Sequence, residues 1–96
     1  MLPGMTEITT VPNVGPAVAR ILARVGVATA EDLRGRDPDE LYERLCLRDG
    51  RRHDVCVLDT FRAAVSYADG APARPWWEFS RERIAAERGV SAGRGA

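Results

Sequence analysis

VPNVGPAVARIL, residues 11–22, is a tight Gly/Pro turn that opens directly onto the start of an amphipathic helix. Pro16 suits the first helical position, and apolar residues then recur at helical spacing until Gly26 supplies a stop. The first four N–H groups of a helix have no partner within the helix and lie at the positive end of its dipole. A compact turn before such a helix therefore predicts outward-facing donors that can hold a phosphate.

Similar start signals recur further along the chain. Thr29, with Asp32 three residues later, predicts a capped turn of helix. Asp37 and Pro38 predict the N-cap and first residue of another helix, in which Glu40 reaches back to the backbone from the third position.

The second half of the chain predicts one long helix and a C-terminal extension. Apolar residues at near-helical spacing place the long helix at about 54–68, and a Pro-containing connector follows at 71–75. Trp76 and Trp77 then begin a last segment whose aromatic side chains are expected to fold back onto the domain. No strand-like alternation persists, so we predict an all-α bundle of about five short helices.

Composition limits the possible functions. The 96 residues suit one small domain, and the 14 basic and 14 acidic side chains cancel, so no global field draws the chain to nucleic acid or an anionic membrane. Every basic residue is Arg, which suits forked contacts to phosphate but is equally expected from a GC-rich genome.

The remaining compositional signals concern location. Two cysteines are too few for a disulfide framework, and residues 1–10 lack the pattern of a signal peptide. No window approaches the roughly 18 apolar residues of a membrane-spanning helix. The sequence therefore predicts a soluble cytoplasmic protein that does not bind a membrane.

Several motifs support a family resemblance. The turn and helix at 11–22, followed by the pattern GVxTxxDL at 26–33, resemble the helix-hairpin-helix superfamily, whose members bind the DNA backbone independently of sequence. LYERLC at 41–46, RHDxCVLDxFR at 52–62 and PWW at 75–77 are similar to a small bacterial family of this superfamily, labelled mitomycin-resistance-type or pathogenicity-locus proteins. The resemblance covers about residues 6 to 85, and those labels state no mechanism.

The resemblance implies a domain organisation. Residues 6–48 would form a pseudo-symmetric tandem helix-hairpin-helix, since a single unit is too small to make a core. Residues 52–88 would supply the packing helix and a Trp-anchored C-terminal extension, which completes one helix-hairpin-helix domain at 1–88. The Gly-rich tail at 89–96 is predicted to be disordered.

The resemblance also implies a DNA-backbone site in the first hairpin. The superfamily usually has Gly where this chain has Asn13, and Asn is the next most tolerant residue for positive φ. The many carboxylates between residues 31 and 43 would repel a polyanion from the second unit. The expected phosphate-facing residues and flanking charges are Asn13, Val14, Gly15, the amide of Ala17, Arg20 and Arg24.

Two other groups of residues were weighed as sites. Cys46, His53 and Cys56 are possible metal ligands, but their spacing is not that of a structural zinc site, and Cys56 falls on an apolar helix face. We therefore predict no metal, no cofactor and no Cys–His catalysis. Trp76 and Trp77 suit stacking on unpaired bases, but in so small a domain one Trp is expected to seal the bundle and the other to lie at a partner surface.

The sequence thus favours a non-enzymatic module that binds single- or double-stranded DNA through its sugar-phosphate backbone. The alternative is a protein–protein interaction adaptor in a repair or stress-response context, with a purely structural hairpin. Zero net charge and the acidic second unit favour this alternative. The oligomeric state stays open.

Overall fold

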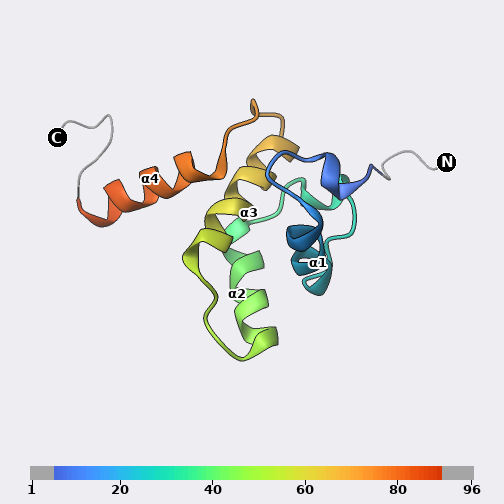
Figure 1. Cartoon of the computed structure of the whole chain (residues 1–96), viewed down its shortest axis with the longest axis horizontal. Coiled ribbons are helices and arrows are strands. Elements are labelled where there is room, and N and C mark those ends of the chain that lie inside the picture. The colour runs from blue at the N-terminus through green and yellow to red at the C-terminus, as the bar shows by residue number, and fades with distance from the viewer. Residues whose placement is uncertain (1–5, 90–96) are drawn as a thin grey trace.

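Four α-helices and two 3-10 helices follow one another in residues 6–89, the part of the chain that the computed structural model describes (Figure 1). In chain order they are η1 (Ile8–Thr10), α1 (Pro16–Arg24), η2 (Ala30–Leu33), α2 (Pro38–Asp49), α3 (Val55–Ala68) and α4 (Trp76–Glu87). The all-α prediction is confirmed, with four α-helices and two 3-10 helices where about five short helices were expected. Of the predicted disordered tail, residues 90–96 lie outside the described residues.

The predicted cap of the second helical turn is formed as expected. The Thr29 hydroxyl accepts a hydrogen bond from the Asp32 amide, while the Asp32 carboxylate accepts one from the Thr29 amide. Asp32 also accepts a bond from the amide of Ala28, and this bond, followed by that from Thr29, holds the pKa of Asp32 below its ordinary value of 3.8. The carboxylate form therefore supports the folded state.

This lowered pKa predicts how stability depends on pH. Because the folded-state pKa of Asp32 is depressed, its contribution is fully present above 3.8 and is lost as the pH falls through the folded value. We expect the melting temperature of Asp32→Asn to fall less steeply with pH below about 4 than that of the parent chain. Circular dichroism melts through this range measure the difference, and parallel curves would contradict the prediction.

The start of α2 follows the sequence signals in part. Asp37 caps the helix by accepting a hydrogen bond from the Asp39 amide at 2.9 Å, and Pro38 occupies the first turn. The expectation that Glu40 reaches back to the backbone is wrong. Its carboxylate binds Arg44 Nε at 2.8 Å, because a partner one helical turn ahead on the exposed face offers a charge-assisted bond.

The two 3-10 helices, η1 and η2, lie side by side. They connect two similar units of the fold, one formed by η1 and α1 and the other by η2 and α2. Thr6 donates to both carboxylate oxygens of Glu31, through its amide at 2.9 Å and its hydroxyl at 2.6 Å. The amide of Ala30 donates to the Thr6 carbonyl at 3.0 Å. Each unit therefore runs from a 3-10 helix through a turn into an α-helix, and the two units share their starting edge.

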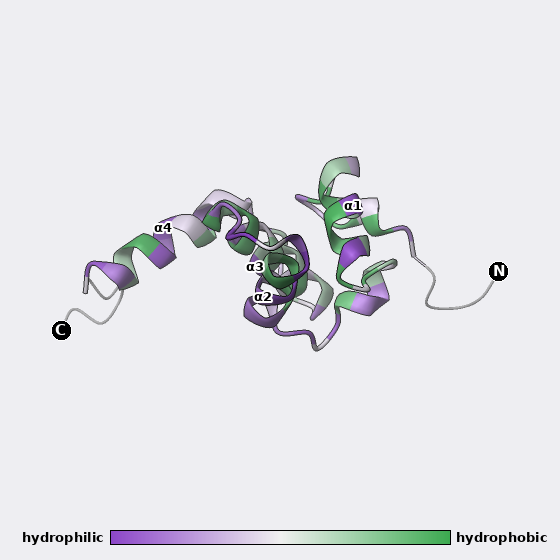
Figure 2. Cartoon of the chain, turned by 90° about the horizontal axis from the view of Figure 1, so that it is seen from below, coloured by the Kyte–Doolittle hydropathy of each residue, from purple (hydrophilic) through white to green (hydrophobic). Residues whose placement is uncertain are grey.

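Helix α3 packs against α2, η2 and α4. Phe61 of α3 is fully buried, and hydrophobic residues mark the α1 and α3 ribbons in Figure 2. The buried hydrophobic cluster consists of Ile8, Val11, Val14, Leu22, Val25, Val27, Leu33, Leu41, Tyr42, Leu45, Cys46, Leu58, Phe61, Ala64 and Val65.

Helix α4 projects from the body (Figure 1). Polar side chains attach it to α3. The predicted Trp anchor is wrong: Trp76 and Trp77 are 38% and 45% exposed, and α4 has no buried residue. The anchor is Asp59 of α3, which is fully buried, accepts a hydrogen bond from Ser80 Oγ at 2.6 Å and pairs with Arg83 at 3.1 Å. Polar side chains thus hold α4 to α3, and no Trp seals the bundle.

Candidate functional site

The turn between η1 and α1 holds the predicted phosphate-facing residues. Asn13 has a φ of 74°, in the left-handed region that Asn tolerates better than most side chains. Gly15 has a φ of −90° and serves as the N-cap of α1, with Pro16 at the first helical position. The local signals of the sequence therefore place the turn correctly.

The backbone amides of this turn are only partly free. Within residues 6–89, the amides of Gly15, Ala17 and Val18 form no hydrogen bond, and no atom lies within 4 Å of the position that a Cβ on Gly15 would occupy. Val14 differs, because its amide donates to the Val11 carbonyl at 3.1 Å and its side chain is buried. The open donors are thus those of the helix start, and Val14 is not among them.

The side chain of Asn13 is committed to the protein itself. Its Nδ2 donates to the carbonyl of Arg74 at 2.8 Å, and its Oδ1 accepts from the amide of Trp76 at 3.2 Å. The turn is therefore bonded to the connector and to the first residue of α4. Sequence reasoning missed this contact, because the partners lie 61 and 63 residues away along the chain.

The two arginines of α1 that were expected as flanking charges, Arg20 and Arg24, are both exposed, but they differ in their partners. Arg24 pairs with Asp49 at 3.0 Å, whereas Arg20 takes part in no ion pair within residues 6–89. The same Asp49 oxygen lies 2.7 Å from His53 Nε2, and this hydrogen bond is the main reason that the pKa of Asp49 is lowered. Arg20 is thus the free cation on α1 near the turn.

The turn of the second unit differs from the first in its bonded amides and in its charge. The amide of Gly35 donates to the side chain of Asp69, the C-cap of α3, at 2.8 Å, and the amide of Asp39 already donates to the Asp37 side chain. The first turn of α2 also carries the carboxylates of Asp39 and Glu40. The negative charge that the sequence predicts for the second unit is therefore present at this turn, and it would repel an anion.

The three possible metal ligands are not assembled into a site. The His53 amide donates to Cys46 Sγ at 3.4 Å, while Cys56 lines a small apolar groove with residues of α1. Burial raises the pKa of the Cys56 thiol, which disfavours the thiolate that binds metal. No group of three or more His, Cys, Asp or Glu side chains suited to a metal ion occurs within the described chain.

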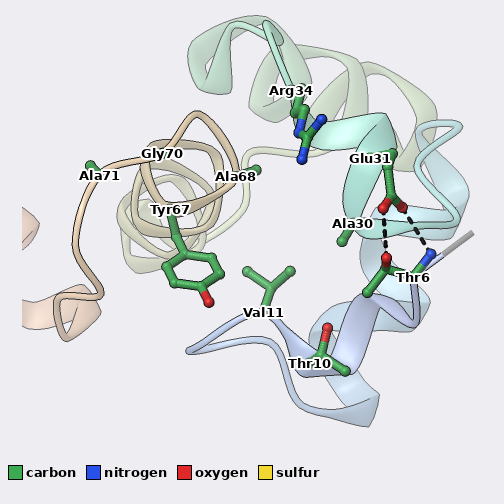
Figure 3. Close-up of a pocket in the computed structure, with 10 residues that line it drawn as sticks. All are labelled: Thr6, Thr10, Val11, Ala30, Glu31, Arg34, Tyr67, Ala68, Gly70 and Ala71. Carbon is green, nitrogen blue, oxygen red and sulfur yellow. Dashed lines mark hydrogen bonds between the residues drawn. The ribbon is translucent and has the colours of Figure 1, made fainter. Parts of the chain in front are cut away.

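A pocket that no sequence pattern predicted lies between η1, η2 and the C-terminal end of α3 (Figure 3). It has a volume of about 410 Å³, and Val11, Arg34 and Tyr67 contribute to its walls. Glu31 at its rim is held by Thr6, and these hydrogen bonds lower the pKa of the carboxyl. Glu31 is therefore a poor general base for the Thr6 hydroxyl that it binds.

None of the helices in residues 6–89 has the length and apolar character needed to cross a lipid bilayer.

Comparison with known proteins identifies a relative of the chain. No solved structure matches the sequence. A relative from Streptomyces lavendulae, named mitomycin resistance protein McrB, is 50% identical over 78 residues, which are 81% of this chain and 74% of the relative.

The family comparison confirms the resemblance to the mitomycin-resistance-type or pathogenicity-locus family. The Pathogenicity locus family profile matches residues 3–85, which include both units, α3 and most of α4. With this match and the similarity to the Streptomyces protein, the chain belongs to the Pathogenicity locus family.

Proposed function

We propose that this protein is a non-enzymatic module that binds DNA through its sugar-phosphate backbone without reading sequence. The open start of α1 carries the proposal: the amides of Gly15, Ala17 and Val18 form no hydrogen bond within residues 6–89, and the Cβ position of Gly15 is open. A phosphate at this point would receive backbone hydrogen bonds at the positive end of the helix dipole. Arg20 adds a free positive charge on the same helix.

The resemblance to helix-hairpin-helix proteins supports the same proposal. Two successive units that run from a 3-10 helix through a turn into an α-helix suit a tandem hairpin arrangement. The carboxylates of Asp37, Asp39 and Glu40 at the start of α2 would repel an anion from the second unit, so one hairpin would touch about two phosphates and give a log–log salt slope near −2. A second protein or a second copy of the chain would be needed for tight binding. By its similarity to McrB, the chain is also proposed to act in mitomycin resistance.

The test is a Gly15→Arg variant. The Cβ site is open and φ is negative, so the substitution leaves the fold intact while its side chain covers the free amides. We expect binding of labelled DNA, measured by fluorescence anisotropy at low salt, to weaken at least about tenfold, as expected when a charge-assisted hydrogen bond is lost.

Ala23→Arg is the matched control, because it adds the same charge to the exposed side of α1 at the other end of the helix. It should bind DNA at least as well as the parent. Equal binding by Gly15→Arg and the parent would contradict the hairpin site, and no binding by the folded parent at low salt would contradict the DNA proposal.

The alternative proposal is an adaptor that binds another protein. The observation that favours it is the exposure of Trp76 and Trp77 on a projecting helix, since aromatic residues are enriched in protein interfaces. In that case the parent chain would bind no DNA. Either function is proposed for the cytoplasm, where free thiols such as Cys46 and Cys56 stay reduced.

A further inference from the structure

One face of α4 alternates apolar and basic side chains. Trp77, Arg81, Ile84 and Arg88 follow one another at intervals of four, three and four residues, which places them on the same side of the helix. Trp77 and Ile84 are 45% and 38% exposed. We call these four residues the α4 stripe.

The arginines of the α4 stripe carry charge that the protein does not neutralise. The Arg81 guanidinium lies over the Trp77 ring, 5.3 Å from its centroid, and neither Arg81 nor Arg88 pairs with a carboxylate within residues 6–89. The stripe therefore combines an exposed aromatic face with two free cations, although the whole chain has no net charge.

The rest of α4 explains why the α4 stripe stays free. Ser80 and Arg83 face α3 and bind Asp59, so the attached side of α4 is polar. Glu78 and Glu82 line a shallow pocket next to Arg81, and both accept hydrogen bonds from Arg74, at 2.8 and 2.5 Å. Arg74 thus pairs with the acidic side chains beside the stripe, and hydrophobic and hydrophilic bands alternate along α4 in Figure 2.

The α4 stripe begins beside the hairpin turn. The Asn13 side chain binds the amide of Trp76, and Trp77 is the next residue. The open amides of α1 and the aromatic face of α4, which are far apart in sequence, are therefore joined through one asparagine. From Trp77 to Arg88 the helix extends for about 16 Å, which is long enough for several nucleotides.

We propose that the α4 stripe binds single-stranded DNA, with an unpaired base stacked on Trp77 and phosphates held by Arg81 and Arg88. The proposal rests on the proposed function, since the adjoining backbone would lie on the hairpin turn. Aromatic rings interleaved with cations are the chemistry that binds single strands, because every base has a π face and a duplex keeps its bases stacked inside. Arg81 and Arg88, which pair with no carboxylate within residues 6–89, suit a polyanion because each guanidinium can bind one phosphate.

The first test compares single-stranded and duplex DNA. We expect Trp77→Ala to weaken binding of the full-length protein to labelled oligothymidylate by roughly tenfold, with little change for a blunt duplex of the same length. Tyr67→Ala, which removes another exposed aromatic ring from α3, is the matched control and should bind as the parent does. Equal weakening for both DNA forms would overturn the single-strand assignment.

The charge is tested through the salt dependence. Arg81→Ala should make the log–log salt slope for the single strand shallower by about 0.7, the value for one phosphate contact. Arg34→Ala removes one exposed arginine outside the stripe and the hairpin, so it controls for net charge. A slope that changes equally in both variants would contradict a role of the α4 stripe.

Stacking has its own optical signal. Trp76→Phe leaves Trp77 as the remaining tryptophan, and we expect oligothymidylate to quench its fluorescence. The absence of quenching, together with unchanged binding by Trp77→Ala, overturns this inference. If Gly15→Arg still abolishes binding in that case, the proposed hairpin function stands; if the parent chain binds neither DNA form, both proposals fail.

Discussion

Replacing Arg83 with methionine is expected to lower the free energy of unfolding by about 3–5 kcal/mol, the range for breaking a buried ion pair. Asp59 is fully buried, and Arg83 donates to both of its carboxylate oxygens at 3.1 to 3.2 Å. Methionine keeps most of the side-chain volume but leaves the carboxylate with only the hydroxyl of Ser80 and the more distant Arg62. The large effect therefore comes from a buried charge that has lost its closest cation.

Urea unfolding followed by circular dichroism measures this effect. Arg62→Met is the matched control, because Arg62 lies 3.8 Å from Asp59 and also pairs with the exposed Asp39, so its removal should have a smaller effect. Adding Asp59→Leu to Arg83→Met should recover much of the lost stability, since the unpaired charge is then absent. Equal effects of the two arginine variants would contradict the assignment of Arg83 as the anchor.

The same substitution is expected to release α4 before the body unfolds. Helix α4 buries no side chain, and an isolated helix of this length is marginal in water. Detachment also returns water to Asp59, which relieves the desolvation of its charge. Hydrogen exchange should therefore show protection lost first in α4 in the Arg83→Met variant, whereas simultaneous loss in all helices would contradict a separate release.

Local sequence signals predicted the helix starts of this fold well. The Thr29–Asp32 pair and the Asp37–Pro38 pair act over three residues or fewer, so their geometry is fixed by the adjacent backbone. The prediction for Glu40 is wrong because the backbone and Arg44 compete for its carboxylate, and the hydrogen bond from Arg44 forms instead. Capping choices of this kind depend on side chains outside the cap itself.

The attachment of α4 was not predictable in the same way. Two adjacent tryptophans suggest burial by their size, but the positions of α4 that face α3 are the polar Ser80 and Arg83. One signal was present in the sequence: Asp59 is the acidic residue in the interior of the predicted core helix and lies beside the apolar Leu58. A carboxylate in a core helix indicates a buried partner, though not which arginine supplies it.

The candidate hairpin site shows the same division between local and distant information. Gly15 and Ala17 keep the open amides that the sequence suggested, because the turn and the helix start are local features. The Asn13 side chain instead donates a hydrogen bond to the carbonyl of Arg74, more than sixty residues away, and Val14 is buried in the core. Binding of DNA at this turn remains a prediction.

Phe61→Ala is expected to lower the free energy of unfolding by about 3–5 kcal/mol, because it leaves a cavity in the middle of α3 as well as removing apolar contacts. Phe61 is fully buried and belongs to the hydrophobic cluster that joins both units to α3. For a domain of this size, each kcal/mol corresponds to roughly 4–8 °C in melting temperature. Leu47→Ala is the control, since Leu47 is 81% exposed and its loss should change stability by less than about 0.5 kcal/mol.

The unfolding transition is expected to differ between Phe61→Ala and Arg83→Met. Phe61 lines a groove with Val18 and Ile21 of α1, so the cavity reaches the helix that presents the open amides. Its loss weakens α1 and α3 together, and we expect the body to unfold in one transition at lower temperature. Arg83→Met instead acts at the polar joint with α4. If Phe61→Ala destabilised the chain no more than Leu47→Ala, Phe61 would not be a main source of stability in the buried cluster.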